Sequence, residues 1–189
     1  MERIQIDDKK FIVGYHTQEH RLGNKLLKPL MCSELNSWLG NGYYFWVEEE
    51  FANYWGEDFK TKNTGAFDIY KANLNTENCI NAVFSEEGYY FFRNQIDKVI
   101  SRFKDLGIAI NLKNVHDYLA DEIWSKKNIS GIIYDDLPKN PYFNKNRKYS
   151  VINHTEGKNE VFYYRKRIQI VVFNTENICN FELYKENQI

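Results

Sequence analysis

The chain has 189 residues, a formal net charge of −1 and 27% charged residues, which is the balance of an ordinary globular domain. The near-neutral charge excludes a uniformly basic polyanion-binding protein. Three widely spaced cysteines form no set with zinc-ligand spacing, so we expect no metal site. No apolar run reaches the roughly 18 residues of a membrane span, and the charged start lacks a signal sequence. We therefore expect one cytoplasmic domain.

The first half of the chain alternates aromatic strands with helices. An apolar run ends at His16 and Thr17, and a pair of glycines at positions 40 and 42 introduces a second aromatic strand. From position 47 apolar residues recur at helical spacing, with three glutamates suited to a helix N-terminus. These patterns predict strands over residues 11–15, 43–46 and 67–74, the last extended by 80–84, and helices over residues 25–30 and 47–59.

The second half places a helical block between strands. Apolar residues at helical spacing predict helices over residues 89–106 and 115–126, the second capped by Asn114. Strands are predicted over residues 132–134, 161–164, 168–173 and 178–183, of which 168–173 is apolar enough to be central and 178–183 is an edge. Strands and helices follow in blocks, which predicts an α+β fold with a helical insert at about residues 86–127.

Three segments of the chain resemble a known family. They are Tyr15-His16-Thr17; Gly40-Asn41-Gly42-Tyr43-Tyr44-Phe45, continued by Ala52-Asn53-Tyr54; and Ile168-Gln169-Ile170. The segments resemble the ADP-ribosyltransferase superfamily, in the His-Tyr-Glu branch that includes poly(ADP-ribose) polymerases and diphtheria-type toxins. The phrase from Trp38 to Trp46 also looks like a group of small bacterial proteins on that fold. The resemblance implies a split antiparallel β-sheet core.

The resemblance implies NAD as the substrate and a role for each matched residue. His16 would hydrogen-bond the ribose on the adenosine side, and Tyr44 would stack on the nicotinamide with Tyr54 on its other face. Gln169 would lie beneath the nicotinamide ribose, at its 2'-hydroxyl. Thr17 and Gly42 complete the expected NAD-binding residues. We expect His16, Tyr44 and Gln169 to converge on one cleft.

Those residue types suit cleavage of the bond between nicotinamide and ribose. The reaction builds positive charge on the sugar, as in glycoside hydrolysis, and its leaving group is flat and cationic, which suits aromatic faces. Core packing is the alternative explanation for His16, Tyr44 and Tyr54. Gln169 favours a site, because a buried amide without partners costs about 1–3 kcal/mol.

Two positions depart from the family pattern. The family has glycine after the histidine, where this chain has Thr17, and glutamate at the third position, where it has Gln169. A glutamine accepts only a neutral hydrogen bond, roughly half as strong as one to a carboxylate, and cannot act as a general base. Single transfer to a nucleophile that needs little activation fits this change. The alternative is that Glu156 or Glu160 supplies the carboxylate.

Two basic segments flank the third motif. Lysines and an arginine lie between Lys139 and Lys148, around Tyr142 and Phe143, and a second cluster runs from Arg165 to Arg167. Basic residues interleaved with aromatics are typical of nucleic-acid contact. A solvated loop and a strand edge protected by charge are the alternative.

The sequence therefore predicts a mono-ADP-ribosyltransferase that modifies a protein or nucleic-acid acceptor. By analogy it would be a toxin or antiviral defence effector, with a neutralising antitoxin as partner. Two alternatives stay open: an NAD glycohydrolase, and a degenerate module that binds NAD or ADP-ribose without turnover. The sequence also leaves open whether the helical insert gates the site or packs behind it.

Overall fold

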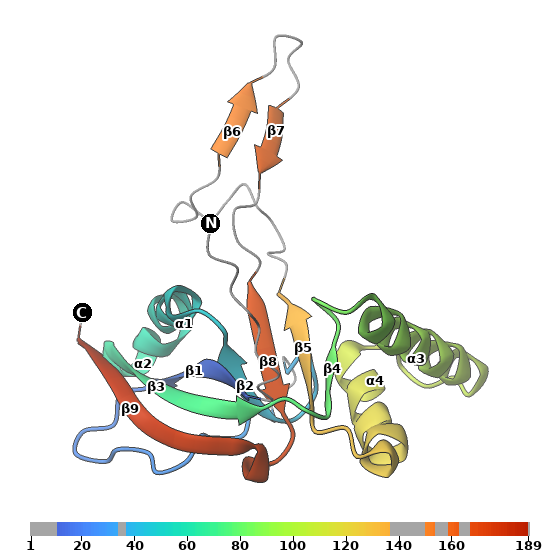
Figure 1. Ribbon diagram of the computed structural model, residues 1–189, viewed down its shortest axis with the longest axis horizontal. Helices are drawn as coiled ribbons and strands as arrows, with labels where there is room; N and C mark the ends of the chain where they lie inside the picture. Colours follow the sequence, from blue (N-terminus) through green and yellow to red (C-terminus); the bar gives the residue numbers. More distant parts are fainter. Residues whose placement is uncertain (1–10, 34–36, 137–149, 154–158, 163–166, 189) are drawn as a thin grey trace.

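A seven-stranded sheet forms the centre of the fold (Figure 1). The computed structural model describes residues 11–33, 37–136, 150–153, 159–162 and 167–188. The strand order in the sheet is β4-β5-β8-β2-β1-β3-β9. β4 and β5 run parallel, and the other neighbours are antiparallel. The predicted α+β class is thus confirmed.

The strands have the following bounds. The sheet contains β1 Phe11–Glu19, β2 Tyr43–Trp46, β3 Ala66–Asn75, β4 Cys79–Asn81, β5 Gly131–Asp135, β8 Ile168–Val172 and β9 Ile178–Gln188. A separate hairpin pairs β6 Ser150–Asn153 with β7 Asn159–Phe162. The apolar strand β8 is buried along its whole length between β5 and β2, which confirms the predicted central strand. β9 lies at the sheet edge, as predicted, and extends beyond residue 183.

The sheet is strongly curled, and its inner face forms one core. Ile133 on β5, Ile170 on β8 and Leu74 on β3 belong to one buried cluster, against which Phe181 on β9 packs. β5 and β9 are five places apart in the sheet, so they can share a core only if the sheet bends round. Alternation of side chains along each strand sends the intervening residues to the outer face.

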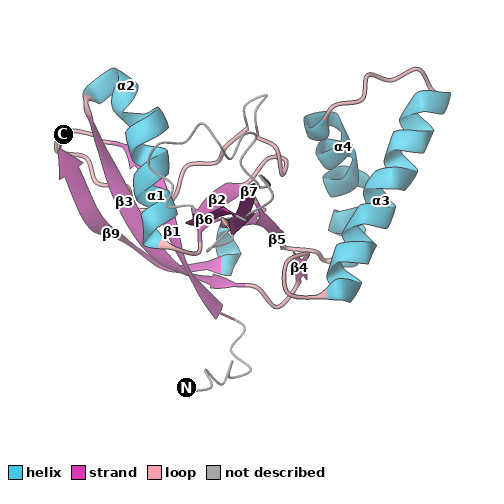
Figure 2. Ribbon diagram, turned by 90° about the horizontal axis from the view of Figure 1, so that it is seen from above, coloured by secondary structure: helices cyan, strands magenta, loops and turns pink. Residues whose placement is uncertain are grey.

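Helices cover the outer face in two groups (Figure 2). α1 Glu49–Trp55, a π-helical turn Gly56–Lys60 and α2 Thr61–Thr64 lie over the β1–β3 half. α3 Glu86–Asp105 and α4 Leu112–Leu119, with the turns Ala120–Trp124 and Ser125–Lys127, pack against the β2–β8–β5 half. Ser85 caps α3 by accepting from the Gly88 amide. Asn111, not the predicted Asn114, caps α4 and accepts from the Asn114 amide.

Two predicted elements are wrong. Residues 80–84 do not extend β3. A turn at residues 75–79 ends β3, and in it the Glu77 amide donates to Asn75 Oδ1. The chain then forms β4 at the opposite edge of the sheet. Residues 25–30 form no helix. Gly23 has a positive φ of 74°, and the Leu26 amide donates to the Tyr70 hydroxyl instead of to a helical carbonyl.

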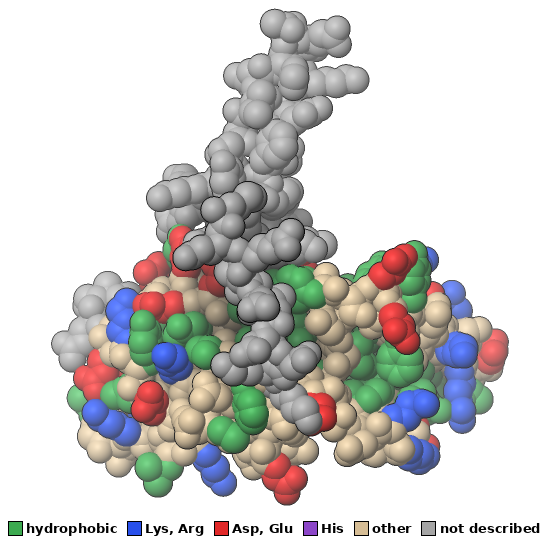
Figure 3. Space-filling model, viewed as in Figure 1, with side chains coloured by type: hydrophobic (Ala, Val, Ile, Leu, Met, Phe, Trp, Pro, Cys, Tyr) green, Lys and Arg blue, Asp and Glu red, His purple; other side chains and the backbone are tan. Residues whose placement is uncertain are grey.

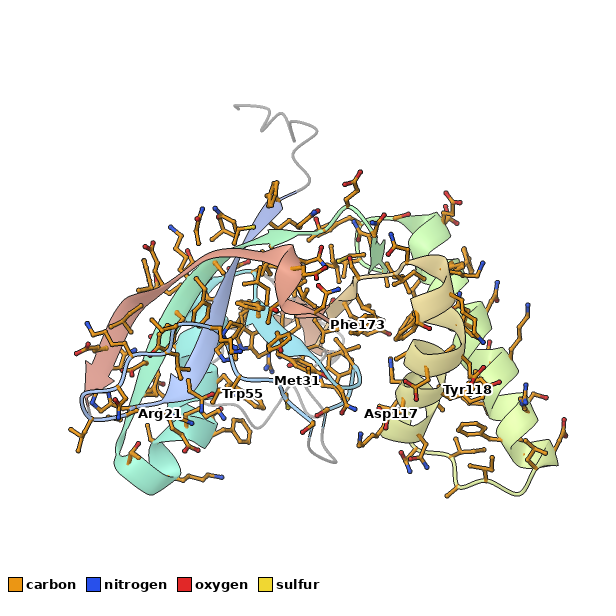
Figure 4. All side chains as sticks on the ribbon, turned by 90° about the horizontal axis from the view of Figure 1, so that it is seen from below. Arg21, Met31, Trp55, Asp117, Tyr118 and Phe173 are labelled. Carbon is orange, nitrogen blue, oxygen red and sulfur yellow. The ribbon has the colours of Figure 1, made fainter. Side chains whose placement is uncertain are left out.

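The segment 20–33, here called the strap, leaves the end of β1 and reaches Gly42, the residue directly before β2. The His20 amide donates to the Ala66 carbonyl, and Cys32 exchanges two backbone hydrogen bonds with Gly42. Figure 4 labels Arg21 and Met31 near the two ends of the strap. Leu22 and Leu27 are 89% and 93% exposed, so their side chains contribute little to the core.

Gly42 allows β2 to lie close to β8. A Cβ at Gly42 would meet Val171 Cγ2 at 2.5 Å and the Val172 carbonyl oxygen at 2.9 Å. We expect Gly42→Ala to lower the free energy of unfolding by about 1–3 kcal/mol through overpacking, measured by urea denaturation. Leu27→Ala is the exposed control and should change it by less than about 0.5 kcal/mol. Equal effects of the two substitutions would contradict this packing role.

Candidate functional site

Three neighbouring strands carry the three residues of the predicted site. His16 lies on β1, Tyr44 on β2 and Gln169 on β8, and the sheet order places β2 between the other two. Tyr15 pairs with Trp46, and Trp46 pairs with Gln169. Segments that are far apart in the chain are therefore adjacent in the sheet.

The three side chains do not share one face, which corrects the expectation that they converge on a single cleft. Residues paired across strands point to the same face, so Tyr44 and Gln169 lie on the outer face. His16 follows Tyr15 by one position and points to the inner face, where its ring lies 5.4 Å from that of Phe45 and 6.1 Å from that of Phe181. The alternation of a β-strand is the physical reason.

His16 nevertheless connects the two faces through the main chain of Tyr44. Its Nδ1 lies 2.9 Å from the Tyr44 carbonyl oxygen, and a carbonyl can only accept, so Nδ1 carries the proton. The other nitrogen, Nε2, is then an acceptor. It is buried and has no hydrogen-bond partner among the described residues. Burial lowers the pKa of His16 to about 4, so the ring is neutral at physiological pH.

Tyr44 is fixed by the glycine turn before it. Its hydroxyl donates to the Gly40 carbonyl at 2.7 Å and accepts from the Leu39 amide at 2.9 Å. Burial raises the pKa of this phenol above its ordinary value. Gly40 adopts a positive φ of 85°, which favours glycine. The Gly-x-Gly signal therefore has a structural cause at both glycines.

Gln169 has the partner that a buried amide requires. The Trp38 indole Nε1 donates to its Oε1 at 2.9 Å, and Gln169 itself is only 6% exposed. Sequence reasoning singled out Gln169 but gave Trp38 no role. The sequence did contain a signal for this contact. A tryptophan stands directly before the glycine turn, and its indole N–H must find an acceptor when the ring is buried.

The remaining predicted NAD-binding residues have structural contacts. The Thr17 hydroxyl donates to the Ala52 carbonyl at 2.8 Å and ties β1 to α1, so it is engaged away from the inner face. Tyr54 donates to Glu50 Oε1 at 2.8 Å and its ring packs against Phe51. Thr17 and Tyr54 thus belong to the outer face, with Tyr44.

Several predicted residues lie outside the described part of the chain. They include Glu156, the stretch between Lys139 and Lys148, and Arg165. Glu160 is placed only through the backbone of β7, opposite Ile152. Arg167 pairs with Asp136 at 2.7 Å and lies over the Trp46 ring at 5.1 Å, so its guanidinium faces the protein. On the face drawn in Figure 3, basic and acidic side chains are interspersed.

The described residues contain no group of three or more histidine, cysteine, aspartate or glutamate side chains able to hold a metal ion. Within the same ranges, no helix is long and apolar enough to cross a membrane.

Comparison with known protein families, curated proteins and solved structures finds no match to this chain.

Buried neutral histidines should make folding sensitive to acid. The pKa values of His16 and His116 are both lowered to about 4 by burial, whereas an unfolded histidine titrates near 6.5. The unfolded chain therefore binds more protons as pH falls from 6.5 toward 4, and stability is lost across that window. We expect the free energy of unfolding to fall by about 2 kcal/mol per histidine between pH 7 and pH 5.

The substitution His16→Asn tests this assignment, since an amide can still donate to the Tyr44 carbonyl but does not titrate. Urea denaturation at several pH values should show about half of the acid sensitivity removed. A variant that keeps the full slope would show that His16 is not a buried neutral imidazole.

Proposed function

We propose that this protein is a mono-ADP-ribosyltransferase that splits NAD and transfers ADP-ribose to a protein or nucleic-acid acceptor. The observation that carries the proposal is His16, an anchored imidazole with a buried acceptor nitrogen that has no partner among the described residues. A ribose hydroxyl is the complementary donor. The adjacency of β1, β2 and β8 supports the proposal, because it gathers all three motifs at one place in the sheet.

The split between β1 and β2 is where a dinucleotide would enter. Tyr15 and Trp46 are the one register pair between these strands, and the strap spans their diverging ends. The strap contacts Tyr70 on β3, and Tyr70 is the cross-strand partner of His16 on β1. In our proposal the strap moves so that ribose reaches Nε2, while the nicotinamide lies toward the aromatic residues of α1 and β2.

The proposed reaction requires no resident cofactor. The bond between nicotinamide nitrogen and the ribose C1' breaks, and its electron pair leaves with neutral nicotinamide. A lone pair of the acceptor forms the new bond to C1', and the acceptor proton passes to solvent. Positive charge develops on the ribose between these events. Roles as a toxin or antiviral effector, with an antitoxin partner, stay predictions that belong to this proposal.

One observation favours a second candidate, a module that binds NAD or ADP-ribose without turnover. Gln169 stands where the family has a carboxylate, and its oxygen already accepts from Trp38. It therefore offers no negative charge to the developing sugar cation.

Incubation with NAD labelled separately on nicotinamide and on the adenosine phosphate distinguishes the possibilities. Released nicotinamide with the adenosine label on a macromolecule supports a transferase, whereas released nicotinamide with free ADP-ribose supports a glycohydrolase. Bound but intact NAD supports the module. Running the assay in cell lysate with and without nuclease identifies a nucleic-acid acceptor. Absence of both binding and cleavage would refute the proposal.

Variants locate the activity. His16→Asn removes the Nε2 acceptor and should weaken NAD binding about tenfold, the worth of one good hydrogen bond. Tyr54→Ala should also weaken it by removing an aromatic face. Tyr90→Ala is the matched control, because Tyr90 is a half-exposed tyrosine on α3. Equal affinities in all three variants, measured by calorimetry, would place the NAD site elsewhere.

A further inference from the structure

The hydrogen bond between Trp38 and Gln169 determines which end of the glutamine amide is available. An indole N–H can only donate, so the amide atom facing it must be the oxygen. Oε1 lies 2.9 Å from Trp38 Nε1, and the amide NH2 therefore points away from Trp38.

The surroundings of Gln169 hold it in this orientation. Its cross-strand partners are Tyr134 on β5 and Trp46 on β2, so aromatic side chains flank it on the same face. Trp38 packs edge-on against Tyr134, with ring centroids 5.4 Å apart. Gln169 is 6% exposed, and among the described residues its side chain makes one hydrogen bond, to Trp38. The amide NH2 is thus the group left to meet a ligand.

We propose that Gln169 is a hydrogen-bond donor to an acceptor atom of the ligand and that Trp38 is the positioning residue that sets this polarity. The inference rests on the proposed function and refines it, because it assigns Gln169 to O2' of the nicotinamide ribose as a donor. A carboxylate in the same place would also accept from Trp38, and its second oxygen would accept again. Glutamine therefore reverses the hydrogen-bond polarity at this position.

Three ligands distinguish whether Gln169 donates or accepts the hydrogen bond at O2'. NAD carries a 2'-hydroxyl, which donates and accepts. Its 2'-deoxy-2'-fluoro analogue on the nicotinamide ribose keeps an acceptor but has no hydrogen to donate, and the 2'-deoxy analogue has neither. Wild-type protein should bind the fluoro analogue within about fivefold of NAD. The variant Gln169→Glu should still bind NAD, since the hydroxyl can turn to donate, but should bind the fluoro analogue at least about tenfold more weakly than NAD.

The chain contains a matched control for this substitution. Gln95 on α3 accepts from the Trp124 indole at 2.6 Å and is 9% exposed, so it is a second buried tryptophan–glutamine pair, inside the helical insert. Gln95→Glu should leave the ratio of NAD to fluoro-analogue affinity unchanged. Trp38→Phe should move that ratio toward the Gln169→Glu value, because the amide is then free to turn its oxygen to the ligand.

Titration calorimetry at matched folded fraction gives the affinities, and the urea midpoint of each variant checks folding. If Gln169→Glu fails to fold, the wild-type and Trp38→Phe ratios still decide the question. Equal ratios for wild type, Gln169→Glu and Trp38→Phe would overturn the assignment of Gln169 while leaving NAD binding intact. Wild-type protein that binds none of the three ligands would overturn the proposed function as well.

Discussion

The bond from His16 Nδ1 to the Tyr44 carbonyl is the interaction on which the proposed site depends. β1 and β2 are neighbours in the middle of a sheet, yet their ladder contains the single pair Tyr15 and Trp46. Where two strands part, backbone groups lose their partners at a cost comparable to a lost hydrogen bond. A side chain of β1 satisfies the carbonyl of β2 at that point. The same bond fixes the tautomer of His16 and so decides what its other nitrogen offers.

The helical insert supports the turn that leads into β2. Lys113 on α4 donates to Asn41 Oδ1 at 3.1 Å, and a Cβ on Gly40 would lie 3.0 Å from that of His116. At the same end of the sheet, Phe173 directly follows β8 and stacks with Trp124 at a ring distance of 5.4 Å. Figure 4 shows Phe173 on the side of the sheet that faces α4. These contacts show that the helical insert packs against the turn that precedes β2.

The sequence predicted local elements well because their signals are local. The apolar run of β8 and the helical spacing of α3 each lie within one segment, and both elements formed as expected. The strap and β4 were mispredicted because a distant hydroxyl, that of Tyr70, and a distant strand, β5, decide their conformation.

The candidate site was likewise predictable where the signals are local and not where distant contacts decide. The three motifs were found from the sequence, and the sheet brings their strands together. Which face each side chain occupies depends on register, and a shift of one residue moves a side chain to the other face. Motif matching contains no register, so it placed His16 with Tyr44 and Gln169 on one surface. Trp38 was missed for a related reason, since its partner lies 131 residues away.

Nitrogen-15 NMR of the histidine side chains tests the central claim most directly. Long-range proton–nitrogen correlations report which imidazole nitrogen carries the proton. We predict that His16 in the ligand-free protein is neutral and protonated on Nδ1, and that addition of NAD shifts the Nε2 resonance because Nε2 accepts a hydroxyl hydrogen. A proton on Nε2, or an unchanged Nε2 resonance at saturating NAD, would contradict it.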